Sequence, residues 1–202
     1  MSKNVDLKRA KILEVAKRRF SHFGMAKTTM AEIAKDLSFS KALLYYYYPD
    51  KNSLYMAVLD YVVNDMIARI DHFINQTNDV EEAMLFTIQT RMEIIMENYN
   101  LFEYSMSLFK DMCSDTMENV RGYFEKEKQQ FIRVFEIGVK SGQIVVDNRD
   151  ECANLLMFSL IGTRLGIMKD LKSSIFPSKE EFDYILNMQN KMVHIFIRGL
   201  RP

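Results

Sequence analysis

Residues 51–74 carry the pattern that most constrains the fold. Apolar side chains recur there three or four positions apart, the spacing of one face of an α-helix. Pro49 ends the preceding segment, because the residue before a proline is pushed out of the helical region, and Asp50 is a good N-cap. The pattern therefore predicts one long helix. Its apolar stripe consists of Leu54, Val58, Tyr61, Val62, Met66 and Ile70.

The same spacing recurs along the rest of the chain, and the composition agrees with it. Only 7 Gly and 3 Pro interrupt 202 residues, while 15 Met accompany abundant Leu, Ile, Lys and Glu. These are helix-forming residues, so we predict an all-α protein of about nine helices. The predicted helices are residues 7–23, 30–37, 41–47, 51–74, 80–99, 101–112, 115–141, 149–170 and 179–198.

Capping residues place several helix ends. A Ser, Thr or Asp followed three positions later by Glu is a capping box, and a glycine after a helix tolerates the left-handed turn that ends it. The predicted boxes are Thr29 with Glu32, Asp79 with Glu82, and Ser178 with Glu181; the predicted ends are Gly24, Gly142 and Gly199.

Neither a metal site, a cofactor site nor a disulfide framework is indicated. Cys113 and Cys152 are isolated, so we expect two reduced thiols, with a redox sensor as the alternative. The N-terminus lacks the apolar core of a signal peptide. The longest apolar run, residues 155–168, contains Arg164 and is too short to span a membrane, so a cytoplasmic protein is expected.

Charge is distributed unevenly although the net charge is zero. Residues 1–60 carry 11 Lys and Arg against 6 Asp and Glu, and the rest of the chain carries 16 against 21. A polyanion would be attracted to the basic N-terminal third.

Two short helices joined by a tight turn, residues 30–37 and 41–47, have the layout of a helix-turn-helix that places its second helix in a DNA major groove. A plain helical hairpin is the alternative. Four consecutive tyrosines end the second helix, at residues 45–48. Successive helical residues are turned by about 100°, so at least two of the rings must point away from the core.

The spacing of fifteen positions in this region resembles the DNA-binding domain of the TetR family of bacterial transcription regulators. The resemblance covers residues 7–60, and beyond it the chain is similar only in being helical and of suitable length. The matching positions are Ala16, Phe20, Gly24, Thr28, Thr29, Ile33, Ala34, Ser40, Lys41, Leu44, Tyr45, Tyr47, Tyr48, Lys51 and Leu54.

The resemblance implies a role for individual positions. Thr29 begins a helix, where a hydroxyl and free amides suit a phosphate. Lys41 can reach guanine O6 and N7 in the major groove. Tyr45 and Lys51 match positions that contact phosphates. The full set implied to contact DNA is Thr28, Thr29, Ser40, Lys41, Ala42, Leu43, Tyr45, Tyr46, Tyr47 and Lys51.

Three departures from the family pattern affect these roles. Ser38 replaces the usual glycine of the turn, at a cost of about 1 kcal/mol if its φ is positive. Ala42 and Leu43 replace a frequent Gly-Thr pair, so Leu43 offers an apolar contact suited to a thymine methyl group. Tyr48 replaces a core Phe, and its hydroxyl needs a partner or solvent.

The larger C-terminal part is expected to enclose an effector site. Residues 80–99 are apolar nearly all round, as in a central buried helix, and methionines make an adaptable lining for a largely apolar ligand. Core filling is the alternative use of these side chains. Arg164 is predicted to form an intersubunit ion pair or to bind a ligand carboxylate. The predicted pocket residues are Met84, Met92, Met96, Tyr99, Tyr104, Tyr123 and Arg164.

Residues 149–170 and 179–198 are expected to pair with their copies in a homodimer, as the resemblance implies. Four small residues form a stripe on the first of these helices, and the second carries more apolar surface than one neighbour would cover. Packing within one subunit is the alternative. The predicted dimer residues are Ser159, Gly162, Thr163, Gly166, Phe182, Ile185, Met192, Val193 and Phe196.

The sequence thus predicts a DNA-binding domain at residues 1–50 and an effector-binding and dimerisation domain at residues 51–202, joined by helix 51–74. The expected function is a ligand-responsive repressor that binds a near-palindromic operator as a homodimer, and no enzymatic activity is expected. Two alternatives stay open: a helical interaction or ligand-binding module without DNA binding, and a helical metal-dependent enzyme. The three histidines lack the Glu three residues earlier that a di-iron bundle requires.

Overall fold

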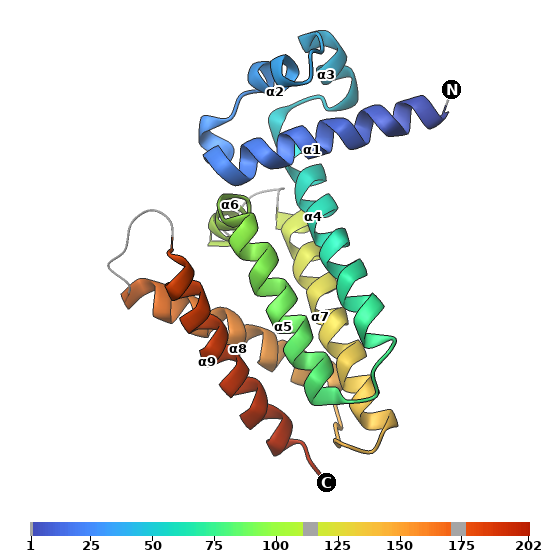
Figure 1. The fold of residues 1–202 in the computed structure, drawn as a ribbon, viewed down its shortest axis with the longest axis vertical. Coiled ribbons are helices and arrows are strands. Elements are labelled where there is room, and N and C mark those ends of the chain that lie inside the picture. The colour runs from blue at the N-terminus through green and yellow to red at the C-terminus, as the bar shows by residue number, and fades with distance from the viewer. Residues whose placement is uncertain (1, 111–116, 171–176) are drawn as a thin grey trace. The chain divides into compact units, whose positions relative to one another are not determined.

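The computed structural model describes residues 2–110, 117–170 and 177–202, and these residues form helices and no strands (Figure 1). The predicted all-α class is confirmed. Predicted helix ends at residues 112 and 115, and Cys113, lie outside the described residues. The helices are α1 Ser2–Lys27, α2 Met30–Asp36, α3 Lys41–Tyr47, α4 Lys51–Ile74, α5 Val80–Glu97, α6 Tyr99–Lys110, α7 Met117–Lys140, α8 Arg149–Asp170 and α9 Lys179–Gly199.

Two of the predicted capping boxes are confirmed. Before α2, the Thr29 hydroxyl accepts from the Glu32 N–H at 3.3 Å while the Glu32 carboxylate accepts from the Thr29 N–H at 2.9 Å. Ser178 and Glu181 repeat this arrangement before α9, at 3.3 and 2.6 Å. Each box satisfies two amides that a helix start leaves without partners.

The third predicted box, before α5, is only half formed. Asp79 accepts from the N–H groups of Glu81 and Glu82, both at 2.9 Å, as a cap should. The Glu82 carboxylate, however, accepts from the Thr77 hydroxyl at 2.5 Å instead of from the Asp79 N–H, which donates to the Thr77 hydroxyl oxygen. The reciprocal half of this prediction is wrong because a threonine two residues upstream competes for both groups.

Glycines in the left-handed region interrupt or end two helices. Gly24 has φ 77° and breaks α1 near its end, and Gly142 has φ 70° just beyond α7. Both match predicted helix ends, and only glycine adopts this conformation without a steric penalty. Gly199 is the last residue of α9 and has no positive φ.

The chain packs as two units, and α4 divides between them. Unit 1 comprises Met1–Asp65 and Glu97–Arg121, and unit 2 comprises Met66–Met96 and Gly122–Pro202. The sequence placed a domain boundary at residue 50, whereas by packing the first half of α4 and all of α6 belong with α1 to α3.

In unit 1, α6 is tied to the end of α1 and to α4. The Asn100 amide donates to the carbonyls of Ser21 and His22 at 2.9 and 3.0 Å, and the Ser21 hydroxyl donates to the Asn98 side chain at 2.8 Å. From α4, the buried Tyr55 hydroxyl donates to the Leu101 carbonyl at 2.6 Å. The two bonds from Asn100 satisfy carbonyls of α1 just before its break at Gly24.

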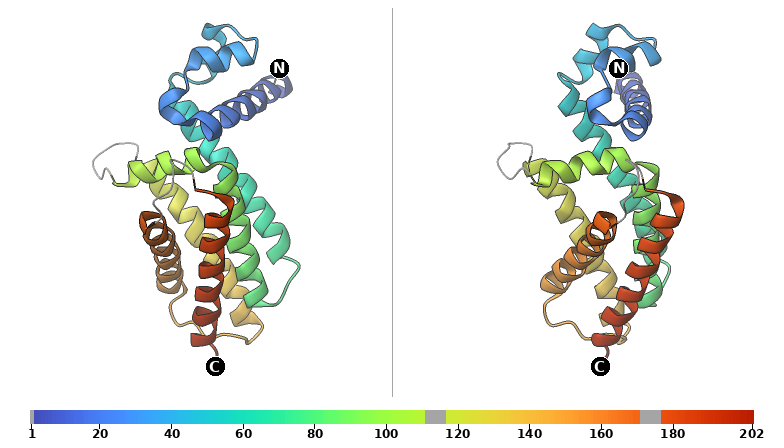
Figure 2. Two further views of the ribbon diagram at one scale, coloured as in Figure 1. Left: turned by 60° about the vertical axis from the view of Figure 1, so that its left-hand side comes forward. Right: turned by 90° about the vertical axis from the view of Figure 1, so that its left-hand side faces the viewer.

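Unit 2 is built around α5, which is buried on most sides (Figure 2). Helix α7 runs beside it, and α8 packs on α9. The prediction that α5 is apolar nearly all round needs one correction, because Arg91 is buried in its middle. Glu127 of α7 compensates this charge within the same unit, at 2.7 Å.

Candidate nucleic-acid interface

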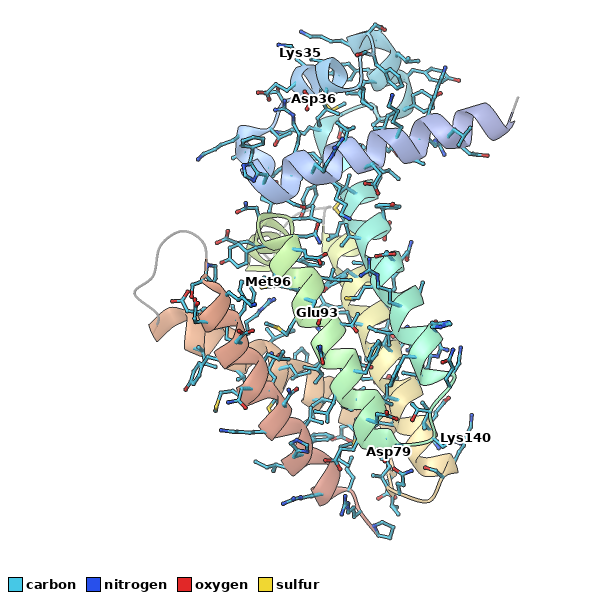
Figure 3. All side chains as sticks on the ribbon, in the orientation of Figure 1. Lys35, Asp36, Asp79, Glu93, Met96 and Lys140 are labelled. Atoms are coloured by element: carbon cyan, nitrogen blue, oxygen red, sulfur yellow. The ribbon has the colours of Figure 1, made fainter. Side chains whose placement is uncertain are left out.

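Helix α2 is fixed to α1 by a charged network around Arg19. Its guanidinium donates to both carboxylate oxygens of Asp36, at 2.6 and 3.0 Å, and lies 3.4 Å from Glu32. Asp36 is labelled in Figure 3. The hydrogen bonds from Arg19 lower the pKa of Asp36, and those from Thr29 lower the pKa of Glu32. The network leaves both carboxylates ionised and holds the first helix of the hairpin in place.

The turn between α2 and α3 contains a strained serine. Ser38 has φ 55°, so the family's usual glycine position does adopt the left-handed conformation here. Its N–H donates to the Lys35 carbonyl at 3.0 Å, and the next N–H, of Phe39, donates to the Ala34 carbonyl at 2.9 Å. These bonds hold the sharp turn despite the cost of a side chain at positive φ.

Helix α3 presents one face to solvent. Ser40 caps it by accepting from the Leu43 N–H at 3.1 Å. Leu44 is buried, which fixes the rotation of the helix and leaves four side chains on the opposite, exposed side. This recognition face consists of Lys41, Ala42, Tyr45 and Tyr46.

The four tyrosines separate by direction, as the sequence required. Tyr46 is 80% exposed and Tyr45 is 47% exposed. Tyr47 is half-buried and meets the Tyr46 ring edge-to-face at 5.4 Å. Tyr48 is also half-buried, and the loss of solvent around it raises the pKa of its hydroxyl. At least two rings therefore point outward, and Tyr45 and Tyr46 are the most accessible of them.

Two predicted DNA contacts have other partners in the structure. Thr28 is buried, and its hydroxyl donates to the Gly24 carbonyl at 2.8 Å, so it closes the end of α1 instead of facing solvent. The Lys51 ammonium donates to the carbonyls of Met25 and Thr28 at 2.9 and 3.1 Å. Both residues position the hairpin, because they bind the backbone that leads into α2.

The capping box also restricts Thr29. Its hydroxyl donates to the Glu32 carboxylate at 2.7 Å, and its N–H is bound to the same carboxylate. Exposed lysines that the sequence analysis did not single out lie near the hairpin, Lys27 at the end of α1 and Lys35 in α2. The basic balance of the N-terminal third was their only signal in the sequence.

Comparison with known proteins agrees with this geometry. The family described as "Bacterial regulatory proteins, tetR family" matches residues 12–58. A transcriptional regulator from Cytophaga hutchinsonii has a similar fold, with a TM-score of 0.81, 25% identity, and 95% of this chain and 97% of that chain covered. The helix-turn-helix region of the chain, residues 12–58, belongs to this family.

Two curated relatives match over shorter stretches. The HTH-type transcriptional regulator RutR of Escherichia coli is 38% identical over 72 residues, 36% of this chain and 34% of RutR. The nucleoid occlusion factor SlmA of Haemophilus influenzae is 22% identical over 120 residues, 58% of this chain and 54% of SlmA. The matched stretch thus spans about half of SlmA and a third of RutR, and the family assignment applies to the hairpin region.

The predicted dimer residues divide into two groups. Phe182, Ile185 and Val193 are buried in unit 2, and Phe196 stacks on Phe135 at 6.0 Å, so these four pack within the subunit. On α8, Gly162 and Gly166 are exposed, and a Cβ at either would meet nothing within 4 Å. The remaining three predicted residues are half-buried: Ser159, Thr163 and Met192. The Thr163 hydroxyl lies within hydrogen-bonding distance of the Ser159 carbonyl and of the Met192 sulfur.

Large apolar side chains that the sequence analysis did not select are exposed on α8 and α9. On each helix these side chains recur at helical spacing, which the sequence already shows. The spacing alone does not tell which apolar stripe of a helix faces the core. The exposed residues are Leu155, Phe158 and Leu165 of α8, and Tyr184 and Ile195 of α9. Together with Gly162 and Gly166 they form what we name the α8–α9 face.

The predicted effector residues do not all share one unit. Tyr99 and Tyr104 belong to unit 1, where Tyr104 meets the Tyr55 ring edge-to-face at 4.9 Å. The other five lie in unit 2: Met84 and Met92 are buried, Met96 and Arg164 are half-buried, and Tyr123 is buried.

Neither hollow described in unit 2 is lined by any of these predicted residues. One, of about 260 Å³, lies where α5 begins beside the end of α9; the other, of about 540 Å³, lies between α4 and α5. In Figure 3, Asp79 marks the end of α5 near the first hollow and Glu93 marks the helix that lines the second.

The isolated thiol that the structure describes has an ordinary environment. Cys152 is half-buried and has no disulfide partner among the described residues. Burial, followed by the nearby Glu151 and Asp147 carboxylates, raises the pKa of its thiol. A raised pKa reduces the thiolate fraction, which disfavours redox reactivity.

Proposed function

We propose that this protein is a ligand-responsive transcriptional repressor that binds a near-palindromic operator as a homodimer and is released from it by a small-molecule effector. The observation that carries the proposal is the recognition face of α3. A short, capped helix offers a lysine, a small residue and two tyrosines outward, and a helix of this kind fits a major groove.

The roles within the proposed interface follow from what each side chain can reach. Lys41 lies in the first turn of α3, where its ammonium can bind guanine O6 and N7. Tyr45 and Tyr46 carry hydroxyls on rigid rings, which suit phosphate oxygens. Lys27 and Lys35 add positive charge at the rim, where contacts position the protein without reading sequence. Thr28 and Lys51 act through the backbone that they bind.

The α8–α9 face supports the homodimer. It combines exposed large apolar side chains with two glycines that leave room for close approach, and apolar surface of this kind marks an interaction site. Two copies of α8 and α9 would bury these residues in a four-helix contact, which places two recognition faces on one DNA.

The effector would bind in unit 2 and change the affinity of the dimer for DNA, a coupling between two separate sites. Absence of enzymatic activity is part of the proposal. Among residues 2–110, 117–170 and 177–202, no group of three or more His, Cys, Asp or Glu side chains is arranged to hold a metal ion. No helix in the same ranges is long and apolar enough to cross a membrane.

Fluorescence anisotropy with DNA from the protein's own promoter tests the proposal. Each phosphate contact releases counterions, so the logarithm of the binding constant should fall steeply and linearly with the logarithm of the salt concentration. A Lys27→Ala, Lys35→Ala double variant should bind more weakly and show a shallower slope, while exposed Lys179→Ala of α9 serves as the control. Absent or salt-insensitive binding would favour an interaction module without DNA binding.

A further inference from the structure

A buried polar cluster in unit 2 joins one residue of the predicted effector pocket, Tyr123, to two charged residues that the sequence analysis did not select. Arg91 of α5 and Tyr123 and Glu127 of α7 are all buried. Two guanidinium nitrogens of Arg91 donate to Glu127 Oε1 at 2.9 and 2.7 Å, and the Tyr123 hydroxyl donates to the same oxygen at 2.7 Å. All three hydrogen bonds that the described residues donate to this carboxylate therefore converge on one of its two oxygens.

The second oxygen and a neighbouring amide lack donors. Glu127 Oε2 accepts no hydrogen bond from any described residue. Gln130 lies one helical turn further along α7 and is only 4% exposed. Its Oε1 has no hydrogen-bond partner. Residues three apart share a helix face, so two unpaired acceptors lie together on the inward side of α7. Of the two, Gln130 Oε1 is the buried atom that has no partner. An unpaired buried acceptor is unfavourable, and a donor that reached it would relieve that cost.

The charges around the cluster keep it an acceptor site. The Arg91 guanidinium compensates the Glu127 carboxylate and also lies over the Phe131 ring, 5.1 Å from its centre. Burial holds the pKa of Tyr123 well above its ordinary value, so its hydroxyl keeps its proton and goes on donating to Glu127 Oε1. The field of Arg164 acts on the same hydroxyl without removing the proton. The ligand must therefore bring the donors that Oε2 and Gln130 lack.

We infer that the effector of this protein enters unit 2 with an end that carries N–H or O–H donors, accepted by Glu127 Oε2 and Gln130 Oε1. This inference rests on the proposed function, in which unit 2 takes an effector. An amine and a hydroxyl share the required chemistry, because Arg91 already balances the charge of Glu127 and a cation is not needed for neutrality. Met84 and Met92, buried in α5 of the same unit, suit a largely apolar remainder.

Calorimetric titration of the full-length protein with matched n-alkyl probes tests this. Octylamine is compared with octyltrimethylammonium, which keeps the charge but has no N–H group, and octanol with methyl octyl ether, which lacks the O–H group. The butyl and dodecyl series repeat the comparison for shorter and longer ligands. We expect the donor-bearing member of at least one pair to bind about tenfold more tightly. Preference in the amine pair alone identifies a cationic effector, and preference in both pairs identifies a general donor site.

Gln130→Met removes one acceptor with little change in volume, and Gln129→Met, at an exposed neighbouring position, is the matched control. The donor preference should shrink several-fold in Gln130→Met and persist in Gln129→Met. Equal binding of donor and donor-free probes by the wild-type protein, or no binding in any series, overturns the inference whether or not the variant folds. Promoter DNA binding measured on the same preparation separates the two proposals. DNA binding without a donor preference overturns the inference about the effector and supports the proposed DNA-binding function. Absence of DNA binding overturns the proposed function itself.

Discussion

Ser38 and Gly142 adopt the same left-handed backbone conformation, with φ of 55° and 70°, although only one of them is a glycine. A Cβ in this region meets the following carbonyl, which costs roughly 1–2 kcal/mol. Ser38→Gly should therefore raise the free energy of unfolding by about 1 kcal/mol, partly offset by the greater freedom of glycine in the unfolded chain. Chemical denaturation measures the change.

The opposite substitution at the second position is the control. A Cβ at Gly142 would meet nothing within 4 Å, so Gly142→Ala tests the backbone conformation without a packing change. It should lower the free energy of unfolding by about 1 kcal/mol. A loss of stability in Ser38→Gly would show that the serine side chain contributes more than its backbone strain costs.

The buried ion pair of Arg91 and Glu127 should make single substitutions costly. Removing one partner leaves an uncompensated buried charge, so Arg91→Ala or Glu127→Ala should each destabilise the protein by about 3–5 kcal/mol. Arg91→Met combined with Glu127→Leu replaces both charges with apolar side chains and should recover most of that loss. Unfolding midpoints of the three variants provide the test, and additive losses in the double variant would contradict it.

Tyr45 and Lys41 should affect DNA binding in different ways. Tyr45→Phe removes one hydroxyl at the proposed phosphate contact and should weaken binding by about 1.5–3 kcal/mol on every DNA sequence alike. Lys41→Ala should relax base preference at one operator position, because its proposed contact is to a base edge. Anisotropy on a set of single-base operator variants distinguishes the two. A change of base preference in Tyr45→Phe would reassign that residue.

The helix-turn-helix region was predictable because its signals are local. Thr29 with Glu32, Gly24, and Pro49 before Asp50 fix helix ends within a few residues of sequence, and the structure agrees with them. The donor-acceptor competition at Thr77 was not predicted, since spacing alone does not show which of two nearby groups a carboxylate selects.

Pairings between distant residues could not be predicted from one sequence. Arg91 and Glu127 are 36 positions apart, and the sequence pattern of neither helix indicates that the two residues pair. On α9, Ile185 faces inward while Tyr184, its immediate neighbour, is exposed, so an apolar stripe by itself does not reveal which side the subunit buries. This is why the predicted dimer residues included Phe182, Ile185 and Val193, which belong to the core.

Phe158 offers a direct test of the α8–α9 face. It is 60% exposed, and Phe158→Glu would place a charge in the centre of the proposed contact, where an unpaired buried charge is unfavourable. We expect sedimentation velocity to show a monomer. Val145→Glu makes the same change at a residue that is 57% exposed outside α8 and α9, and it should leave the dimer intact. Dimers in both variants would exclude this face.

Acid should weaken the hold of α1 on α2. The pKa values of Asp36 and Glu32 are lowered in the folded state by hydrogen bonds from Arg19 and Thr29, so their stabilising contribution is complete above the ordinary carboxyl range of about 4. It is lost as pH falls through the lowered folded values, because the unfolded chain takes up protons first. Urea unfolding from pH 7 to pH 3 should show a slope that Asp36→Asn with Glu32→Gln flattens.

The hydrogen bonds from Asn100 and Tyr55 have a consequence for anyone who would transplant the DNA-reading part of this protein. A chimera cut after residue 65 would separate α1 from the Asn100 amide that binds its Ser21 and His22 carbonyls, and Tyr55 from the Leu101 carbonyl. The segments needed to keep the DNA-binding domain folded are therefore not contiguous in the sequence. A protein that receives this domain has to provide an equivalent of residues 98–101.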